Sequence, residues 1–130
     1  MKREIKFRAW DKKRQAMVRF GEGTRYSVHF DGTIEEFIPA LESDFYGVIS
    51  HRAYFNDKTD EFILMQYTGL KDKKGKEIFE GDITNQGWLV IFESGCFWLT
   101  SHDTTFKVDY LYMLNNEIEI IGNIYENKEN

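Results

Sequence analysis

The side chains best suited to bind a metal ion or to act as a general base are the three histidines, His29, His51 and His102. None of them lies three or four residues from another histidine, a cysteine or a carboxylate in a recognised metal-binding spacing. His102 is followed directly by Asp103; the two side chains could converge on a loop, whereas on a strand they point to opposite sides. A surface histidine is the commoner arrangement, so the sequence predicts no metal site and no cofactor.

Cys96 is the single cysteine, and it lies between a Ser-Gly pair and the aromatic residues Phe97 and Trp98. A nucleophilic cysteine needs a neighbouring base and an electropositive setting, and these neighbours are apolar or neutral. We therefore expect a buried structural thiol. One cysteine also excludes an intrachain disulfide and a cysteine-based metal cluster, which fits a reducing compartment.

Carboxylates are abundant, but a catalytic pair of the glycosidase type needs a fixed separation that a sequence does not reveal. Asp82 stands out because it lies in a long motif over residues 64–83, and its ordinary role there is to accept hydrogen bonds from a turn. Glu35 and Glu36 are adjacent and are expected on a solvated edge. The chain contains no P-loop and no dinucleotide fingerprint, so the sequence predicts that the protein is not an enzyme.

Basic residues are concentrated at the start of the chain. Residues 1–20 contain eight lysines and arginines and two acidic residues, a net charge of +6; because the whole chain carries −5, the other 110 residues carry −11. Basic side chains interleaved with aromatic rings can hold phosphates and stack on bases. The candidate interaction surface combines an N-terminal cluster with a lysine-rich loop over 71–76: Lys6, Arg8, Trp10, Lys12, Lys13, Arg14, Lys71, Lys73, Lys74 and Lys76.

Nucleic-acid binding is the alternative function that this surface suggests. If Ile5 and Phe7 point inward, Lys6, Arg8 and Trp10 share the outer face of a strand. However, a pI near 5.2 is unlike that of a nucleic-acid-binding domain. A charged strand face that prevents edge-to-edge aggregation explains the same residues.

Protein contact is the favoured class of function. The chain contains 11 Phe, 7 Tyr and 3 Trp, more aromatic rings than a core of this size is expected to bury. Exposed aromatic residues anchor interfaces. A positive end and a negative body could also pair head to tail between copies, so the expected partner is a second copy or another protein.

Period-two patterning predicts strands in the first half of the chain. Strands over 5–10 and 16–20 form a hairpin around a polar break. Strands over 26–30 and 33–38 form a second hairpin, whose turn contains Gly32 because glycine tolerates a positive φ.

The middle of the chain carries weaker signals. Residues 39–45 are predicted as a short helix, because Pro39 suits a first helical position and Leu41 and Phe45 lie four residues apart. Residues 46–55 and 61–68 are predicted as a further pair of strands.

In the second half, the sequence predicts a charged turn over 69–77, a hairpin of 88–93 with 96–100, and a strand over 118–125. Residues 106–114 alternate as in a strand, with a helix as the alternative. Gly69 and Gly81 are expected where strands end and the chain turns. Gly122, inside an apolar strand, indicates a bulge.

These patterns predict one domain over residues 1–130 that is mainly β. N-terminal hairpins over 1–60 precede a small, SH3-like, partly open β-barrel over 61–130, with at most one or two short helices. No apolar run reaches the length of a membrane span or a signal peptide. We therefore expect a cytoplasmic protein with no membrane contact.

Three blocks of sequence carry a resemblance: REIKFRAWDK at 3–12, LMQYTGLKDKKGKEIFEGDI at 64–83 and EIIGNIYEN at 119–127. In this order and position they resemble the YopX family. The resemblance implies a phage or prophage gene product of a bacterial host cytoplasm, with no accepted activity and hence no catalytic residue to transfer. Residues 21–60 and 84–115 match no familiar pattern, so a function specific to this chain could reside there.

Taken together, the sequence predicts an uncharacterised phage or prophage accessory protein, a non-enzymatic protein-interaction module able to homo-oligomerise. The alternative is a nucleic-acid-binding β-barrel module that uses the basic N-terminal strand and the 71–76 loop.

Overall fold

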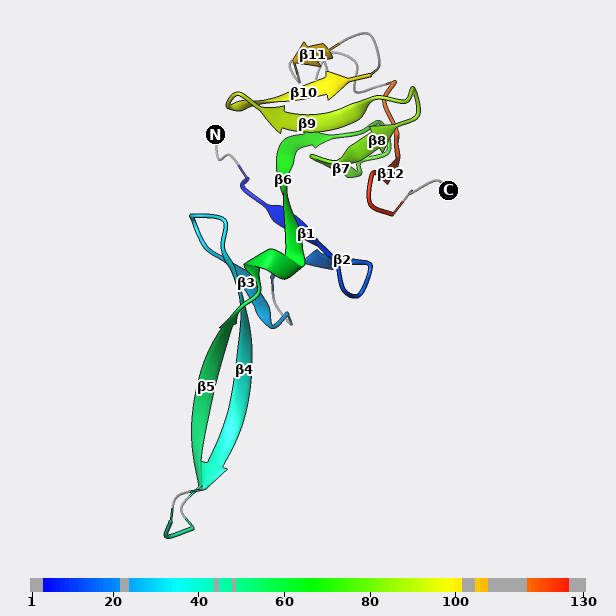
Figure 1. The fold of residues 1–130 in the computed structure, drawn as a ribbon. Helices are drawn as coiled ribbons and strands as arrows, with labels where there is room; N and C mark the ends of the chain where they lie inside the picture. Colours follow the sequence, from blue (N-terminus) through cyan, green and yellow to red (C-terminus); the bar gives the residue numbers. More distant parts are fainter. Residues whose placement is uncertain are drawn as a thin grey trace.

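The computed structural model of the chain describes residues 4–21, 24–43, 45–47, 49–101, 105–107 and 117–126, with the backbone alone at 40–43, 49–53 and 106–107 (Figure 1). These residues form three antiparallel sheets and one 3₁₀ turn, η1 (Thr59–Glu61). The prediction of a mainly β protein is therefore confirmed. No helix in the described ranges has the length and hydropathy needed to cross a bilayer.

The central sheet has the order β2–β1–β6–β7 and consists of β1 (Phe7–Asp11), β2 (Ala16–Arg19), β6 (Phe62–Lys71) and β7 (Glu77–Phe79). The predicted hairpin of β1 and β2 is confirmed. Its turn closes on Asp11, whose Oδ1 accepts the N–H groups of Lys13 and Arg14 at 3.0 and 3.1 Å. Because β6 pairs with β1, this sheet joins the two halves of the chain.

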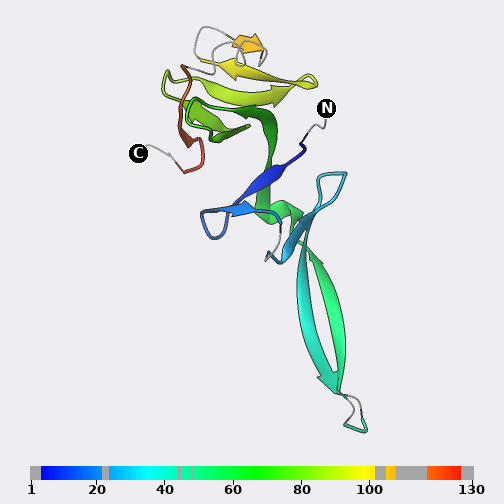
Figure 2. The same ribbon diagram turned by 180° about the vertical axis from the view of Figure 1, so that it is seen from behind.

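The second sheet, of order β3–β4–β5, is a projecting arm. It consists of β3 (Tyr26–Val28), β4 (Ile34–Ser43) and β5 (Ile49–Asp57). Figures 1 and 2 show β4 and β5 as a long two-stranded ribbon that extends away from the other two sheets. The predicted hairpin of β3 and β4 is confirmed, and Gly32 in its turn has a φ of 87°.

The third sheet has the order β11–β10–β9–β8–β12 and curls into an open half-barrel. Its strands are β8 (Asp82–Thr84), β9 (Leu89–Glu93), β10 (Cys96–Thr100), β11 (Thr105–Lys107) and β12 (Ile120–Asn123). The predicted β9–β10 hairpin is confirmed, as is the irregularity at Gly122. The predicted strand over 106–114 is described only up to Lys107. An SH3-like barrel stays a prediction.

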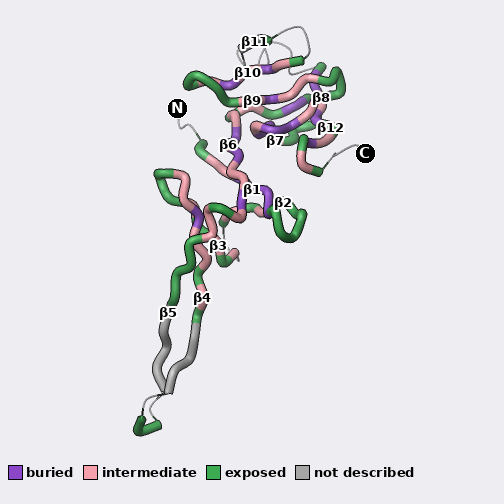
Figure 3. Tube along the Cα trace, viewed as in Figure 1, coloured by how far each residue is buried: buried purple, intermediate pink, exposed green. Residues whose placement is uncertain are grey.

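The described residues form two hydrophobic cores, and each core includes residues of the central sheet. Ala9, Ile34 and Phe62 form the core at the base of the arm. The core of the half-barrel is larger, and its buried residues are Ile78, Val90, Phe97, Leu99, Ile118 and Ile120. The central sheet thus connects two separately packed parts (Figure 3).

The predicted helix over 39–45 is wrong, because β4 runs through Pro39 to Ser43. The N–H of Phe37 donates to Arg25 O on the β3 side at 2.7 Å. Pro39, two residues further on, therefore faces the same side, away from β5. A proline there removes no hydrogen bond from the β4–β5 ladder, so the strand tolerates it.

The predicted pairing of 46–55 with 61–68 is also wrong, although both segments contain strands. β5 pairs with β4, whereas β6 pairs with β1 and β7. The η1 turn between them redirects the chain from the arm into the central sheet. Gly69 lies inside β6 at a shift of register and does not end a strand as predicted, whereas Gly81 does lie in the turn between β7 and β8.

Gly81 offers a test of how tightly this turn packs. Gly81 and Gly87 have nearly equal φ values of 88° and 83°, but only at Gly81 would an added Cβ meet a neighbour, Met65 Sδ at 3.1 Å. Gly87→Ala should lower the free energy of unfolding by about 1–2 kcal/mol for the left-handed backbone. Gly81→Ala should cost about 1–3 kcal/mol more through overpacking, measured by urea denaturation. Equal losses for the two variants would contradict the packing argument.

Candidate functional site

The most buried ion pair of the described residues joins Arg8 of β1 to Asp82 of β8. Arg8 Nη2 lies 2.6 Å from Asp82 Oδ1, and the two residues are 2% and 1% exposed. Asp82 Oδ2 accepts the N–H of Phe79 at 2.8 Å, which confirms the turn-capping role predicted for this aspartate. Burial raises the pKa of Asp82, and the Arg8 guanidinium and the Phe79 N–H oppose that rise.

The Arg8 guanidinium is held in place by more than the ion pair. Arg8 Nη2 also donates to the carbonyl oxygen of Glu80 at 3.3 Å. Its Cζ lies 4.7 Å from the centroid of the Phe79 ring, a cation–π contact that Arg19 of β2 also makes at 5.1 Å. None of the described residues accepts a hydrogen bond from Arg8 Nε. The cluster therefore orders the β7–β8 turn over the central sheet.

β1 is buried on both faces, because other elements cover each side of the central sheet. Ala9 packs into the core at the base of the arm, whereas Trp10 stacks on Tyr125 with ring centroids 5.9 Å apart. Figure 3 shows most of β1 in the colour of buried residues. The outer strand face predicted for Arg8 and Trp10 is therefore wrong: they are 2% and 4% exposed, whereas Ile5 is 66% exposed.

Lys6 remains accessible at the edge of this cluster. Its ammonium group bonds to Glu77 and lies 3.0 Å from Glu4 Oε1. These hydrogen bonds, first that with Glu77, raise the pKa of Lys6. Because two carboxylates neutralise the Lys6 ammonium group, it attracts a phosphate group less strongly.

The other predicted basic residues are exposed but lie in two separate elements. Lys12, Lys13 and Arg14 occupy the β1–β2 turn, where Lys13 Nζ lies 3.2 Å from Glu61 Oε1. Lys71 ends β6, and Lys73, Lys74 and Lys76 follow in the loop to β7. Lys73 and Lys74 lie 3.8 and 3.2 Å from the Glu119 carboxylate. The two groups thus each face acidic partners of their own.

Asp72 organises the 71–76 loop from within. Its Oδ1 accepts the N–H groups of Lys74 and Lys76, both at 2.9 Å, and its Oδ2 accepts the N–H of Ile120 of β12 at 2.9 Å. Burial would raise the pKa of Asp72, but the N–H groups of Ile120, Lys76 and Lys74 together lower it below its ordinary value. The loop is therefore a structural link to the last strand.

The three resemblance blocks meet in space. Arg8 comes from the first, Asp82 from the second, and Tyr125, which stacks on Trp10, from the third. Asp72 ties the second block to the third once more. The blocks therefore encode one packed unit of the fold.

The family model of the YopX protein matches residues 6–130. This chain belongs to the YopX family. The YopX-family chain is also similar to the crystal structure of protein EF1440 from Enterococcus faecalis, with 27% sequence identity over 95% of each chain and a TM-score of 0.59. No curated protein matches it.

Glu80 is the residue of this YopX-family protein that sequence reasoning missed. It borders a cleft of about 240 Å³ that also contains Met65, Ile124 and Tyr125. Burial raises the pKa of Glu80 and of Tyr125. Glu80 Oε1 accepts the N–H of Gln66 at 2.9 Å, so the carboxylate fastens β6 to the β7–β8 turn. Its position beside Gly81 in the longest block is the only signal that the sequence offered.

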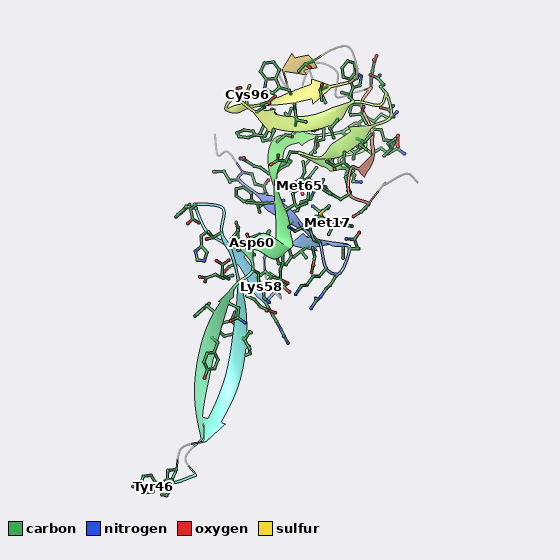
Figure 4. The ribbon with its side chains drawn as sticks, in the orientation of Figure 1. Met17, Tyr46, Lys58, Asp60, Met65 and Cys96 are labelled. Atoms are coloured by element: carbon green, nitrogen blue, oxygen red, sulfur yellow. The ribbon has the colours of Figure 1, made fainter. Side chains whose placement is uncertain are left out.

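The remaining candidates for chemistry are dispersed. Cys96 lies at the start of β10 (Figure 4) and is half-buried, so the prediction of a buried thiol is wrong. His29 Nε2 lies 3.1 Å from the Glu35 carboxylate at the base of the arm. The side chains of His51 and His102 lie outside the described residues. Across the described residues, no three His, Cys, Asp or Glu side chains form a group that could hold a metal ion.

The arm of the YopX-family protein exposes apolar side chains. Phe37 and Phe55 are cross-strand partners, with ring centroids 5.7 Å apart, and are 42% and 61% exposed. Phe45 and Tyr46 stand exposed at the tip, where Figure 4 labels Tyr46. The arm lies within residues 21–60, outside the three resemblance blocks but inside the range that the family model matches.

Loss of the buried ion pair should destabilise the whole fold. Arg8→Met leaves the Asp82 carboxylate buried and unpaired, so we expect the free energy of unfolding to fall by about 3–5 kcal/mol in urea denaturation. Arg8→Met with Asp82→Asn should recover part of this loss, because the amide oxygen can still accept from Phe79. Lys13→Met, which removes an exposed pair, is the matched control and should cost less than about 1 kcal/mol. A similar small loss for Arg8→Met would refute the role of the pair.

Proposed function

We propose that this protein is a non-enzymatic protein-interaction module of a phage or prophage, and that its contact surface is the β4–β5 arm. The observation that carries the proposal is the exposed Phe37–Phe55 pair on a ribbon that projects from the rest of the fold (Figure 2). The phage or prophage role is supported by the family membership.

The shape of the arm favours contact with another protein. An isolated two-stranded ribbon is at best marginally stable in water. Among the described side chains of β4 and β5, Ile34 at the base of the ribbon is the one that belongs to a hydrophobic core. Aromatic side chains are enriched at interface hot spots, because they bury a large area at a small cost in conformational entropy. A partner that covered the arm would bury Phe37 and Phe55 and stabilise the ribbon.

Nucleic-acid binding is the second candidate, favoured by the exposed Lys12, Lys13 and Arg14 at the β1–β2 turn. It has less support than the arm. Trp10 stacks on Tyr125, so its ring is not available to stack on a base. Arg8 forms a buried ion pair with Asp82, so its guanidinium is not available to bind a phosphate. The acidic pI also argues against it.

Arm substitutions should abolish partner capture. In affinity capture from host cells with quantitative mass spectrometry, Phe37→Thr with Phe55→Thr should reduce the specific partners at least about tenfold, because hot-spot losses of this kind exceed 1.4 kcal/mol. Threonine keeps the β propensity of the arm. Phe92→Thr with Ile121→Thr removes comparable exposed apolar area from the half-barrel and should retain the partners. Retention of all partners by the arm variant would count against the proposal.

Nucleic acid should not bind with useful affinity. In a fluorescence anisotropy titration at low salt, labelled single- and double-stranded DNA and RNA should give no saturation at roughly tens of micromolar protein, where non-specific binders begin to bind. Saturable binding that is weakened by Lys12→Gln, Lys13→Gln and Arg14→Gln together would instead establish the second candidate.

A further inference from the structure

The two long edges of the arm differ in how they are protected. Within the described residues, β4 has β3 and β5 as neighbours, whereas β5 pairs with β4 alone. A free strand edge presents a row of unpaired N–H and C=O groups, which another strand can join. The arm therefore has a covered side and an open side.

The covered side is β4. β3 pairs with its first three residues, Ile34, Glu35 and Glu36. Beyond β3, Pro39 faces outward and has no N–H to offer, a common protection of an edge strand. β4 also carries Glu35, Glu36 and Glu42, so two β4 edges brought together would repel each other.

The open side is β5. In an antiparallel ladder, hydrogen-bonded and non-hydrogen-bonded pairs alternate. Because Phe37 donates toward β3, its cross-strand partner Phe55 turns its N–H and C=O to the free edge, and so does Ala53 two residues before. The nine residues of β5 contain no proline and no lysine, the residues that commonly prevent an edge strand from pairing with another chain.

The charge of β5 suits pairing with itself. Arg52 and Asp57 are its only formally charged residues, so the strand is neutral and two copies do not repel each other. An antiparallel pair of identical strands uses the same surface on both partners and closes by two-fold symmetry. Such a two-fold axis is perpendicular to the sheet, so the Phe37–Phe55 pairs of both copies lie on the same face.

We propose that β5 of one chain pairs antiparallel with β5 of a second chain, joining the two arms into one continuous sheet in a two-fold dimer. This inference rests on the proposed function, and it takes a second copy of the same chain as the partner that binds the arm. The junction consists of main-chain hydrogen bonds flanked by aromatic side chains. It therefore differs from a head-to-tail contact between the basic end and the acidic body, which salt would screen.

Ala53→Pro tests this junction directly. It removes an N–H that faces the free edge and leaves the β4–β5 ladder intact. In sedimentation equilibrium of the full chain, we expect the wild type to be a dimer at low and at high salt, and Ala53→Pro to be a monomer. Leu41→Pro is the matched control: it places the same residue on the outer side of β4 and should remain dimeric.

A second variant covers the case that proline disturbs the arm. Ala53→Lys adds a charge at the edge, so two copies would bring like charges together, and it should also yield a monomer with an unchanged circular dichroism spectrum. A wild-type monomer at all concentrations, or Ala53→Pro and Ala53→Lys dimers, would overturn the inference. If the wild type is monomeric while Phe37→Thr with Phe55→Thr still loses captured partners, this inference fails and the proposed function stands.

Discussion

The contact between Arg8 and Asp82 connects parts of the chain that are more than seventy residues apart, and it joins the half-barrel to β1, the strand on which the base of the arm also packs. Arg8 lies in the middle of the central sheet, and Asp82 begins the first strand of the half-barrel. A buried ion pair of this kind contributes little net stability, because the desolvation of both charges offsets their attraction. The pair matters because it specifies one position of the half-barrel on the central sheet. A different position that kept Arg8 or Asp82 buried would leave that charge without its partner, which is strongly unfavourable.

The same strand that docks the half-barrel also supports the arm. Ala9, next to Arg8, packs with Ile34 at the start of β4 and with Phe62 at the start of β6. One face of β1 therefore packs Ala9 into the core at the base of the arm, whereas its other face pairs Arg8 with Asp82 of the half-barrel and stacks Trp10 on Tyr125. A change in the position of β1 would move both parts.

Sequence patterns identified most of the strands but fewer of their contacts. The hairpins of β1 with β2, β3 with β4 and β9 with β10 follow from local turns, so a local pattern is sufficient to find them. Alternation placed Arg8 and Trp10 on one face correctly but could not show that residues 80–82 and Tyr125 cover it. The helix predicted at Pro39 failed for a similar reason, because the direction of its missing N–H depends on pairing with β5.

The difference between the contacts of the three signature blocks and those of the arm bears on function. The signature blocks supply contacts that hold the fold together, through Arg8, Asp72, Asp82 and Tyr125. The residues that these blocks share with the family are therefore explained by the fold. In the described part of the arm, the Phe37 and Phe55 rings pack on each other and remain largely exposed to solvent, and the packing of the fold does not require that exposure. Exposed aromatic rings on a ribbon with one guarded edge and one open edge are costly to an isolated chain. That cost is offset once a second strand covers β5, which is why the arm, and not the signature blocks, is the place where binding is expected.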